Sequence, residues 1–148
     1  MQVRLRPVRS DDLPVFFAHQ CDAQAADIVG FVPRTRPAFD EHWHKIITRP
    51  DVLIRTVEAD GEVAGYVSTF PRDERTEIAY WLGRNQWRRG IGQTAVTKFL
   101  ELDRNRPIFG LVAVRNIASL AILHRCGFVS VAEETGPGGV QEHLLRLD

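Results

Sequence analysis

The sequence is poor in cysteine and has no long apolar run. Cys21 and Cys126 are the only cysteines among 148 residues, and two thiols so far apart form no disulfide framework of the secreted kind. No stretch approaches the roughly 20 apolar residues that a membrane-spanning helix needs. The first ten residues also lack the apolar core of a signal peptide. We therefore expect a cytoplasmic protein with no membrane partner.

The chain has no excess charge of either sign. Its 19 basic residues are balanced by 19 acidic ones, so the formal net charge is zero. Without an overall positive field we expect no nucleic-acid partner, and any anion-binding site must be local. We also expect no metal site, because His42 and His44 stand two apart in a predicted helix and point to different faces.

Length and composition are typical of one globular domain. Hydrophobic residues make up 44% of the chain and charged residues 26%, the balance of a folded protein rather than a disordered one. A chain of 148 residues can bury a substantial core but is short for two independent ones. We expect a single domain over residues 1–148.

Hydrophobic periodicity predicts a mixed α/β layer structure. The expected order is a strand, two helices, three strands, a helix, a strand, a helix and two strands. One helix is expected over Phe39 to Thr48, and another from about Gly92 to Leu102. The sequence ADGE between two alternating segments predicts a β-hairpin. Cys21 to Pro37 shows no clear pattern.

The segment NQWRRGIGQTAV, Asn85–Val96, follows the predicted strand Thr76 to Leu82 and leads into a helix. A glycine-rich turn at a helix start exposes unpaired backbone amides at the positive end of the helix dipole, which is a phosphate-binding arrangement. Gly90 and Gly92 would let the backbone approach an anion, with arginines beside it. The alternative is a tight surface turn with two solvated arginines.

Two common phosphate-binding motifs do not fit this turn. A Walker A loop needs lysine and then serine or threonine after its second glycine, but Gly92 is followed by Gln93. Gly90, Gly92 and Ala95 match a Rossmann fingerprint literally, yet the next strand ends in Val114 without the carboxylate that would bind a ribose.

A second motif follows the next strand. Asn116 is placed to cap a helix, and Gly127 stands just past its end, with Phe128 folding back on the last turn. Ser119 lies in the first turn of this helix. The spacing is N-x-x-S followed by G-F.

Together, YWLGRNQWRRGIG and this second motif resemble the GNAT superfamily of acyl-CoA-dependent N-acyltransferases. The family's turn reads [Q/R]-x-x-G-x-[G/A], and here Trp87 stands at its first position. A tryptophan there resembles the ribosomal-protein-alanine acetyltransferase-like branch. The resemblance implies a mixed, mostly antiparallel twisted β-sheet of about seven strands, flanked by about four helices.

The resemblance also implies acetyl-CoA as cosubstrate, with no metal. The family's turn binds the coenzyme A pyrophosphate, and the following motif contacts the pantetheine arm. The residues expected to bind acetyl-CoA are Leu82, Trp87, Arg88, Arg89, Gly90, Ile91, Gly92, Gln93, Asn116 and Ser119. A backbone amide near Leu82 would meet the oxyanion. For Asn116, helix capping is the alternative.

Catalysis in this family implies a base and an acid. Glu77 is the expected base, since many members place a glutamate on this strand; the alternative is a solvated residue paired with Arg75. The family's usual acid, a tyrosine seven residues after the asparagine, is Leu123 here. Ser119 is the expected replacement, and a structural serine at the helix start is the alternative.

The expected reaction is acetyl transfer to a primary amine, on a small molecule or a protein N-terminus, by direct attack in a ternary complex. Tyr80 and Trp43 are candidate acceptor contacts, although core packing is an alternative for each. The closing strands are a candidate surface for a homodimer. The competing function is a catalytically silent acyl-CoA-binding or sensor module on the same fold.

Overall fold

The computed structural model describes residues 1–30 and 32–148. Its α-helices are α1 Leu13–Gln20, α2 Ala23–Val29, α3 Arg36–Thr48, α4 Ile91–Leu102 and α5 Ile117–Arg125. Its strands are β1 Val3–Arg6, β2 Leu53–Ala59, β3 Glu62–Arg72, β4 Arg75–Leu82, β5 Ile108–Ala113, β6 Val129–Thr135 and β7 Gln141–Leu147. Short 3-10 turns are η1 Ser10–Asp12, η2 Arg84–Gln86 and η3 Pro137–Gly139.

The strands form one seven-stranded sheet in the order β1-β2-β3-β4-β5-β7-β6. Every neighbouring pair is antiparallel except β4 and β5, which run parallel. This confirms the predicted mixed, mostly antiparallel sheet of about seven strands. The described residues form five α-helices, one more than expected.

The additional helix, α2, lies in the stretch that periodicity left unassigned. Asp22 caps it by accepting hydrogen bonds from the amides of Gln24 and Ala25. Gly30 ends it in the left-handed conformation. A seven-residue helix gives too few turns for a visible apolar stripe, and Pro33 nearby obscures it further.

The predicted hairpin is confirmed between β2 and β3. Asp60 and Gly61 form its two-residue turn, and both have positive φ, as a type I′ turn requires. Glycine occupies the second position without steric cost, and aspartate tolerates the first. The turn therefore sets the pairing of the two strands locally.

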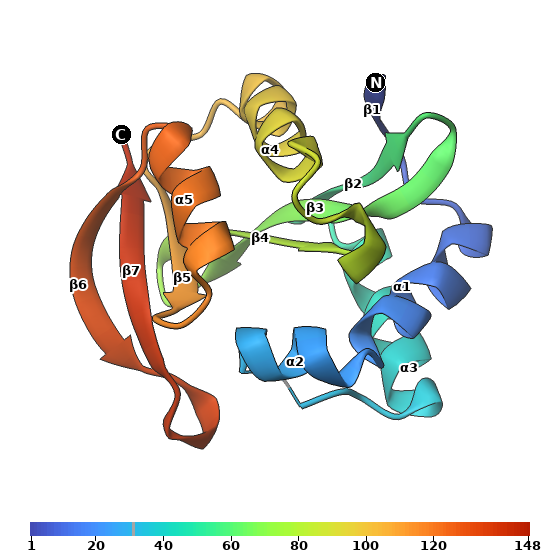
Figure 1. The fold of residues 1–148 in the computed structure, drawn as a ribbon, viewed down its shortest axis with the longest axis horizontal. Helices are drawn as coiled ribbons and strands as arrows, with labels where there is room; N and C mark the ends of the chain where they lie inside the picture. The colour runs from blue at the N-terminus through green and yellow to red at the C-terminus, as the bar shows by residue number, and fades with distance from the viewer. Residues whose placement is uncertain (31) are drawn as a thin grey trace.

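Helices cover both faces of the sheet (Figure 1). On one face, α4 and α5 bury the main core, in which Phe99, Ile108 and Leu145 are fully buried. On the other face, α1 and α3 pack an aromatic cluster around Phe16 and Trp43. Side chains alternate along each strand, so neighbouring strand residues serve opposite cores.

The sheet opens between β4 and β5. Only Thr76 and Glu77 pair with this neighbour, opposite Ile108 and Phe109. Beyond Glu77 the strands diverge, although β4 continues to Leu82 and stays paired with β3. This leaves a wedge in the middle of the sheet that widens toward the start of α4.

A buried ion-pair network joins the N-terminal strand to η1 and β2. The Asp12 carboxylate accepts two hydrogen bonds from Arg6, both at 2.8 Å, and others from the Arg9 amide and the Thr56 hydroxyl. Arg6 also donates to Glu58 at 2.9 Å. The carboxylates of Asp12 and Glu58 are therefore both bound by Arg6.

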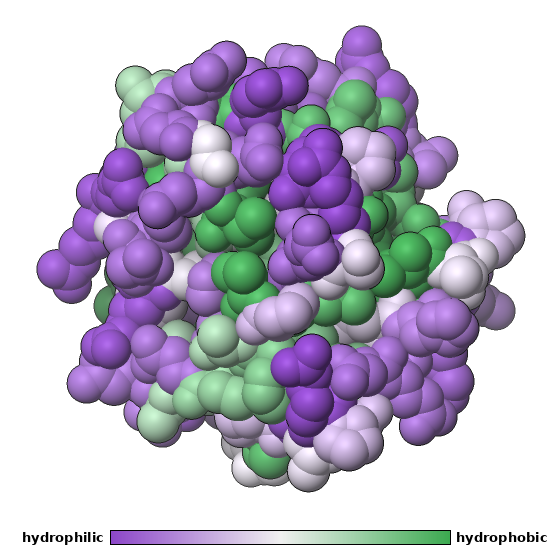
Figure 2. Space-filling view, turned by 90° about the vertical axis from the view of Figure 1, so that its right-hand side faces the viewer, coloured by the Kyte–Doolittle hydropathy of each residue, from purple (hydrophilic) through white to green (hydrophobic). Residues whose placement is uncertain are grey.

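Figure 2 shows the side of the molecule that lies to the right in Figure 1. Hydrophilic and hydrophobic residues are interspersed on this face rather than separated into large areas. Across residues 1–30 and 32–148, no helix combines the length and the apolar character needed to cross a membrane.

Candidate active site

The turn before α4 presents unpaired backbone amides at the helix start. Arg88 and Gly90 both adopt the left-handed conformation, with φ of 63° and 76°. No side chain caps α4, so its first amides remain available. A side chain at Gly90 would meet no atom within 4 Å, which shows that the turn faces open space. This geometry fits an anion.

Gly92 serves a different purpose from the one we expected. Its Cβ position points not toward the open side of the turn but into the contact of α4 with α5 and β4. A Cβ there would lie 2.7 Å from Cδ1 of Ile122 and 3.4 Å from Cδ1 of Leu82. The missing side chain therefore permits close helix packing rather than approach of an anion.

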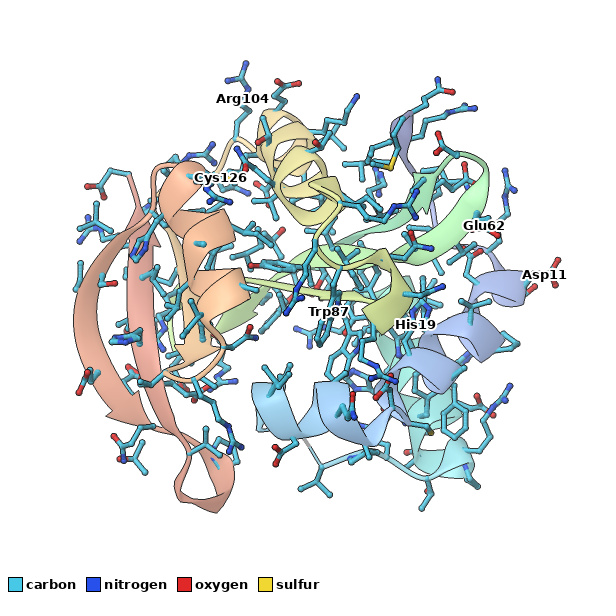
Figure 3. All side chains as sticks on the ribbon, in the orientation of Figure 1. Asp11, His19, Glu62, Trp87, Arg104 and Cys126 are labelled. Carbon is cyan, nitrogen blue, oxygen red and sulfur yellow. The ribbon has the colours of Figure 1, made fainter. Side chains whose placement is uncertain are left out.

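Trp87 supports the turn from inside. Its indole Nε1 donates to the carbonyl oxygen of Leu82 at 3.0 Å, and its ring packs on the main core. Figure 3 shows Trp87 near the centre of the molecule, below α4. The tryptophan at the first motif position thus fixes the end of β4 relative to the turn.

The two arginines of the turn lie on the surface. Arg89 donates to the side chain of Gln86 at 2.8 Å, and its guanidinium lies 4.0 Å from Asp60. Arg88 forms no side-chain hydrogen bond or ion pair within the part of the chain that the structure describes. The Arg88 guanidinium therefore remains available beside the exposed amides, whereas Arg89 already contacts Gln86 and Asp60.

The end of β4 also supplies a backbone donor to the opening. The amide of Gly83 donates to the carbonyl of Ala64 in β3 at 2.9 Å. Because backbone groups alternate sides along a strand, the amide of Leu82 points away from β3 and toward the wedge. This agrees with the direction of the Leu82 carbonyl, which accepts the Trp87 indole.

The predicted helix start at Asn116 is confirmed. The Asn116 side chain accepts a hydrogen bond from the amide of Ser119 at 3.3 Å, so it acts as the N-cap of α5. At the other end, Gly127 has positive φ and the Phe128 amide donates to Leu123. The capping interpretation of Asn116 is therefore present in the structure.

Ser119 is hydrogen-bonded to Tyr80 across the wedge. The Tyr80 hydroxyl lies 2.6 Å from Oγ of Ser119 and 3.3 Å from its carbonyl oxygen. Burial raises the pKa of Tyr80, and the hydrogen bond to Ser119 opposes that effect only in part. The phenol therefore stays protonated at neutral pH. Leu123, at the usual tyrosine position, is 1% exposed in the core.

A cavity of about 560 Å³ occupies the wedge and continues to the face covered by α1, α2 and α3. On the α5 side it is lined by Tyr80, Ser119 and Leu123. On the opposite side it is lined by Trp43, Tyr66, Glu77 and Glu142, among others. The two sides meet where β4 and β5 separate, so one space is accessible from both faces of the sheet.

Glu77 is held by arginines. It is 3% exposed, its Oε2 accepts from Nε of Arg75 at 2.9 Å, and Arg72 lies 3.7 Å away. The arginine pair that we considered as an alternative is therefore present, although the residue is buried rather than solvated. The Glu77 carboxylate also lines the cavity.

Trp43 belongs to the aromatic cluster. It is 3% exposed and packs against Phe16 and Tyr66, with ring centroids 5.0 and 4.8 Å apart. Trp43 also lines the cavity, so the same side chain belongs to the core and to the cavity wall. Tyr80, the other predicted acceptor contact, points instead to the α5 side.

Sequence reasoning missed Glu142 of β7 as a cavity residue. It lies in VQEHLLRL, where no motif distinguishes it from a surface strand residue. Only pairing of β7 beside β5, with Glu142 opposite Ala113, brings it to the wedge. Among the described residues, no group of three His, Cys, Asp or Glu side chains is placed to hold a metal ion.

Comparison with known families agrees with this geometry. The model of the acetyltransferase (GNAT) domain matches residues 2–129. The chain belongs to the GNAT acetyltransferase family. The prediction from the two motifs is thus confirmed, as is the assignment of the chain as an acetyltransferase. No curated protein sequence matches the chain.

Solved structures share the fold over nearly the whole chain. Spermidine N-acetyltransferase from Vibrio cholerae, solved with CoA and spermine, has a TM-score of 0.82 at 19% identity, covering 98% of this chain and 93% of its own. Aminoglycoside acetyltransferase AAC(6')-Ib in complex with coenzyme A has a TM-score of 0.81 at 18% identity. The match covers 99% of this chain and 94% of that one. RimL, a ribosomal L7/L12 alpha-N-protein acetyltransferase in complex with CoA, has a TM-score of 0.83 at 16% identity. The match covers 99% of this chain and 94% of that one.

Proposed function

We propose that the protein transfers an acetyl group from acetyl-CoA to a primary amine, by direct attack in a ternary complex. The observation that carries the proposal is the wedge between β4 and β5, which begins at the exposed amides before α4 and narrows to Glu77. The six residues from Glu77 to Leu82 span about 16 Å from the first Cα to the last. An extended pantetheine arm fits along such an edge.

In this arrangement the pyrophosphate binds the turn at Arg88 to Gln93, and the thioester reaches the cavity. The neighbouring structures with coenzyme A support this placement through their shared fold. A backbone amide of β4 that points into the wedge, on the same side of the strand as the Leu82 amide, would stabilise the oxyanion of the tetrahedral intermediate. The amine approaches from the opposite face of the sheet, where Trp43 lines the cavity.

The departing sulfur meets the Ser119 and Tyr80 hydroxyl groups. When Tyr80 donates to Ser119, the Ser119 hydrogen is free to bind the developing thiolate. The N-terminus of α5 adds a favourable dipole at the same point. A thiolate with a pKa near 8.5 is already a tolerable leaving group, so stabilisation by hydrogen bonds suffices.

The acceptor is a small amine or a protein N-terminus, and the enzyme functions as a monomer or as a homodimer. β6 is exposed along almost its whole length, which supports pairing through the closing strands. The alternative, a silent acyl-CoA-binding module, shares the turn and the wedge but needs no catalytic hydroxyl groups.

Release of free CoA thiol in the presence of a panel of amines and N-terminal peptides tests the proposal. Mass spectrometry should then find acceptors heavier by one acetyl group. Tight acetyl-CoA binding without thiol release for any acceptor would favour the silent module instead.

A further inference from the structure

Five charged side chains gather on the face of the sheet that carries α2 and α3, and their charges do not cancel. Arg75 pairs with Glu77 at 2.9 Å and with Glu134 at 3.3 Å, while Arg72 lies 3.7 Å from Glu77. The carboxylate of Glu142 has no hydrogen bond or ion pair within residues 1–30 and 32–148. Three carboxylates thus face two guanidinium groups, and Glu142 is the one left over.

Glu142 is placed at the open end of the wedge. It is registered opposite Ala113, the last residue of β5, and it lines the cavity. Leu145 lies three positions after Glu142 on β7 and packs in the core under α4 and α5. Because side chains alternate along a strand, Glu142 faces the other side of the sheet. Its carboxylate lies directly against Gly136, where any Cβ would collide with it. Gly136, in the connection between β6 and β7, therefore leaves room for the Glu142 carboxylate.

The environment disfavours charge on Glu142. Burial raises its pKa, Arg72 opposes this effect, and the carboxylates of Glu134 and Glu77 raise the pKa further. A partly buried carboxylate without a partner destabilises the fold, and a cation would relieve that cost. A base with a raised pKa is also better matched to proton transfer near neutral pH.

The opposite wall of the cavity has an apolar and aromatic part. Trp43, Tyr66, Ile46 and Val52 line it. Arg34 and His42 line the same space. Burial lowers the pKa of His42, and the charge of Arg34 adds to this effect; burial also raises the pKa of Tyr66 to about 12. An ammonium group on an apolar or aromatic body therefore fits this space, with the ammonium at Glu142 and the body against Trp43 and Tyr66.

We propose that Glu142 binds the ammonium group of an aryl or alkyl monoamine and accepts its proton before attack. This inference rests on the proposed acetyl transfer. One N–H proton moves to the carboxylate, and the freed lone pair forms the C–N bond with the thioester carbon. The C–S bond then breaks, the nitrogen loses a second proton to water, and the thiolate takes one up. Glu142 finally returns its proton to water.

Direct binding of phenethylammonium, measured calorimetrically without acetyl-CoA, tests the assignment. The wild-type protein should bind this probe, and Glu142→Gln should weaken binding at least about tenfold. Glu133→Gln is the matched control, because Glu133 is exposed, pairs with His143 and lies one register position away on β6. It should bind like the wild type. Equal affinity for wild type and Glu142→Gln, or no binding to wild type, would overturn the proposal.

Thermal unfolding gives a second readout that needs no ligand. Because the pKa of Glu142 is raised in the folded state, its ionised form destabilises the fold above that pKa. Glu142→Gln should therefore raise the Tm at pH 7.5 by about 2 °C, and the difference should vanish below about pH 4. A lower Tm at pH 7.5 would show a stabilising partner and contradict the inference.

The two proposals fail in different ways. If amine binding depends on Glu142 but no acceptor yields free CoA thiol, acetyl transfer is wrong and the amine site stands. If thiol release occurs and Glu142→Gln has normal kcat and KM for a monoamine, the role of Glu142 is wrong and the proposed function stands.

Discussion

The Tyr80 hydroxyl lies 2.6 Å from Oγ of Ser119 and so joins β4 to α5 across the open wedge. Leu123 occupies the helix position at which the family resemblance implies a tyrosine, and it is buried in the core. The strand thus supplies a phenol that the helix lacks. Two hydroxyl groups in contact leave one hydrogen free to point into the cavity.

Removing either hydroxyl of this pair should slow acetyl transfer by a similar factor. Tyr80→Phe and Ser119→Ala should each lower kcat about tenfold or more, because a hydrogen bond to a charged group contributes about 1.5–3 kcal/mol. The double variant should lose little more than either single variant, since both act through one donor. Steady-state kinetics provides the test.

Calorimetry should find the acetyl-CoA Kd nearly unchanged in the Tyr80 and Ser119 variants. Ser119→Thr, which keeps the hydroxyl, should retain most of the activity. Multiplicative losses in the double variant would show that the two hydroxyl groups act independently and would contradict the shared donor.

The arginines of the turn should control acetyl-CoA affinity. Replacing both Arg88 and Arg89 with alanine removes two charge-assisted donors beside the exposed amides and should raise the acetyl-CoA Kd about tenfold or more. Arg104→Ala, which removes a surface arginine after the far end of α4, is the matched control (Figure 3). An equal Kd for the double variant and the control would remove these arginines from the binding site.

Gly92 should matter for stability through helix packing. Alanine there would place Cβ 2.7 Å from Cδ1 of Ile122, the movable end of that side chain, so Gly92→Ala should lower the free energy of unfolding by no more than about 1 kcal/mol. Adding Ile122→Val removes the colliding methyl group and should restore part of the loss. Chemical denaturation measures both; a double variant no better than Gly92→Ala would argue against this contact.

Asp12 should stabilise the fold in a pH-dependent way. Burial alone would raise its pKa, but hydrogen bonds from Arg6, the Arg9 amide and Thr56 lower it overall. A lowered folded pKa gives stability above the ordinary value, near pH 4, that is lost as the pH falls through the folded pKa. Asp12→Asn should cost about 2 kcal/mol at pH 7 because the partly buried Arg6 loses its main partner and keeps only Glu58.

Urea denaturation over a pH series measures this dependence. The difference between wild type and Asp12→Asn should shrink as the pH falls below about 4, first because Asp12 takes up a proton in the unfolded chain and then, at lower pH, in the folded protein. A difference that stays constant from pH 7 to pH 3 would mean that the charge of Asp12 is not its source.

Local signals in the sequence were sufficient for most of the fold. The ADGE turn, the cap at Asn116 and the stop at Gly127 depend on neighbouring residues, and all three appear as expected. Helix α2 was missed because its seven residues show little periodicity. The purpose of Gly92 was also misjudged, since Ile122 approaches it only in the folded chain.

The site was less predictable because its contacts come from distant segments. The motif residues before α4 lie together as expected, since they are consecutive. The contact of Tyr80 with Ser119 spans 39 positions, and Glu142 reaches the wedge only through the order of β5 and β7. Whether Glu77 is free or held by Arg75 likewise depends on burial, which composition does not reveal.

The most direct test of the central claim is a crystal structure of the protein with acetyl-CoA. The account predicts that the diphosphate contacts the amides between Arg88 and Gln93, and that the thioester lies between β4 and β5 beside Ser119. A diphosphate bound elsewhere, with the turn before α4 empty, would contradict it.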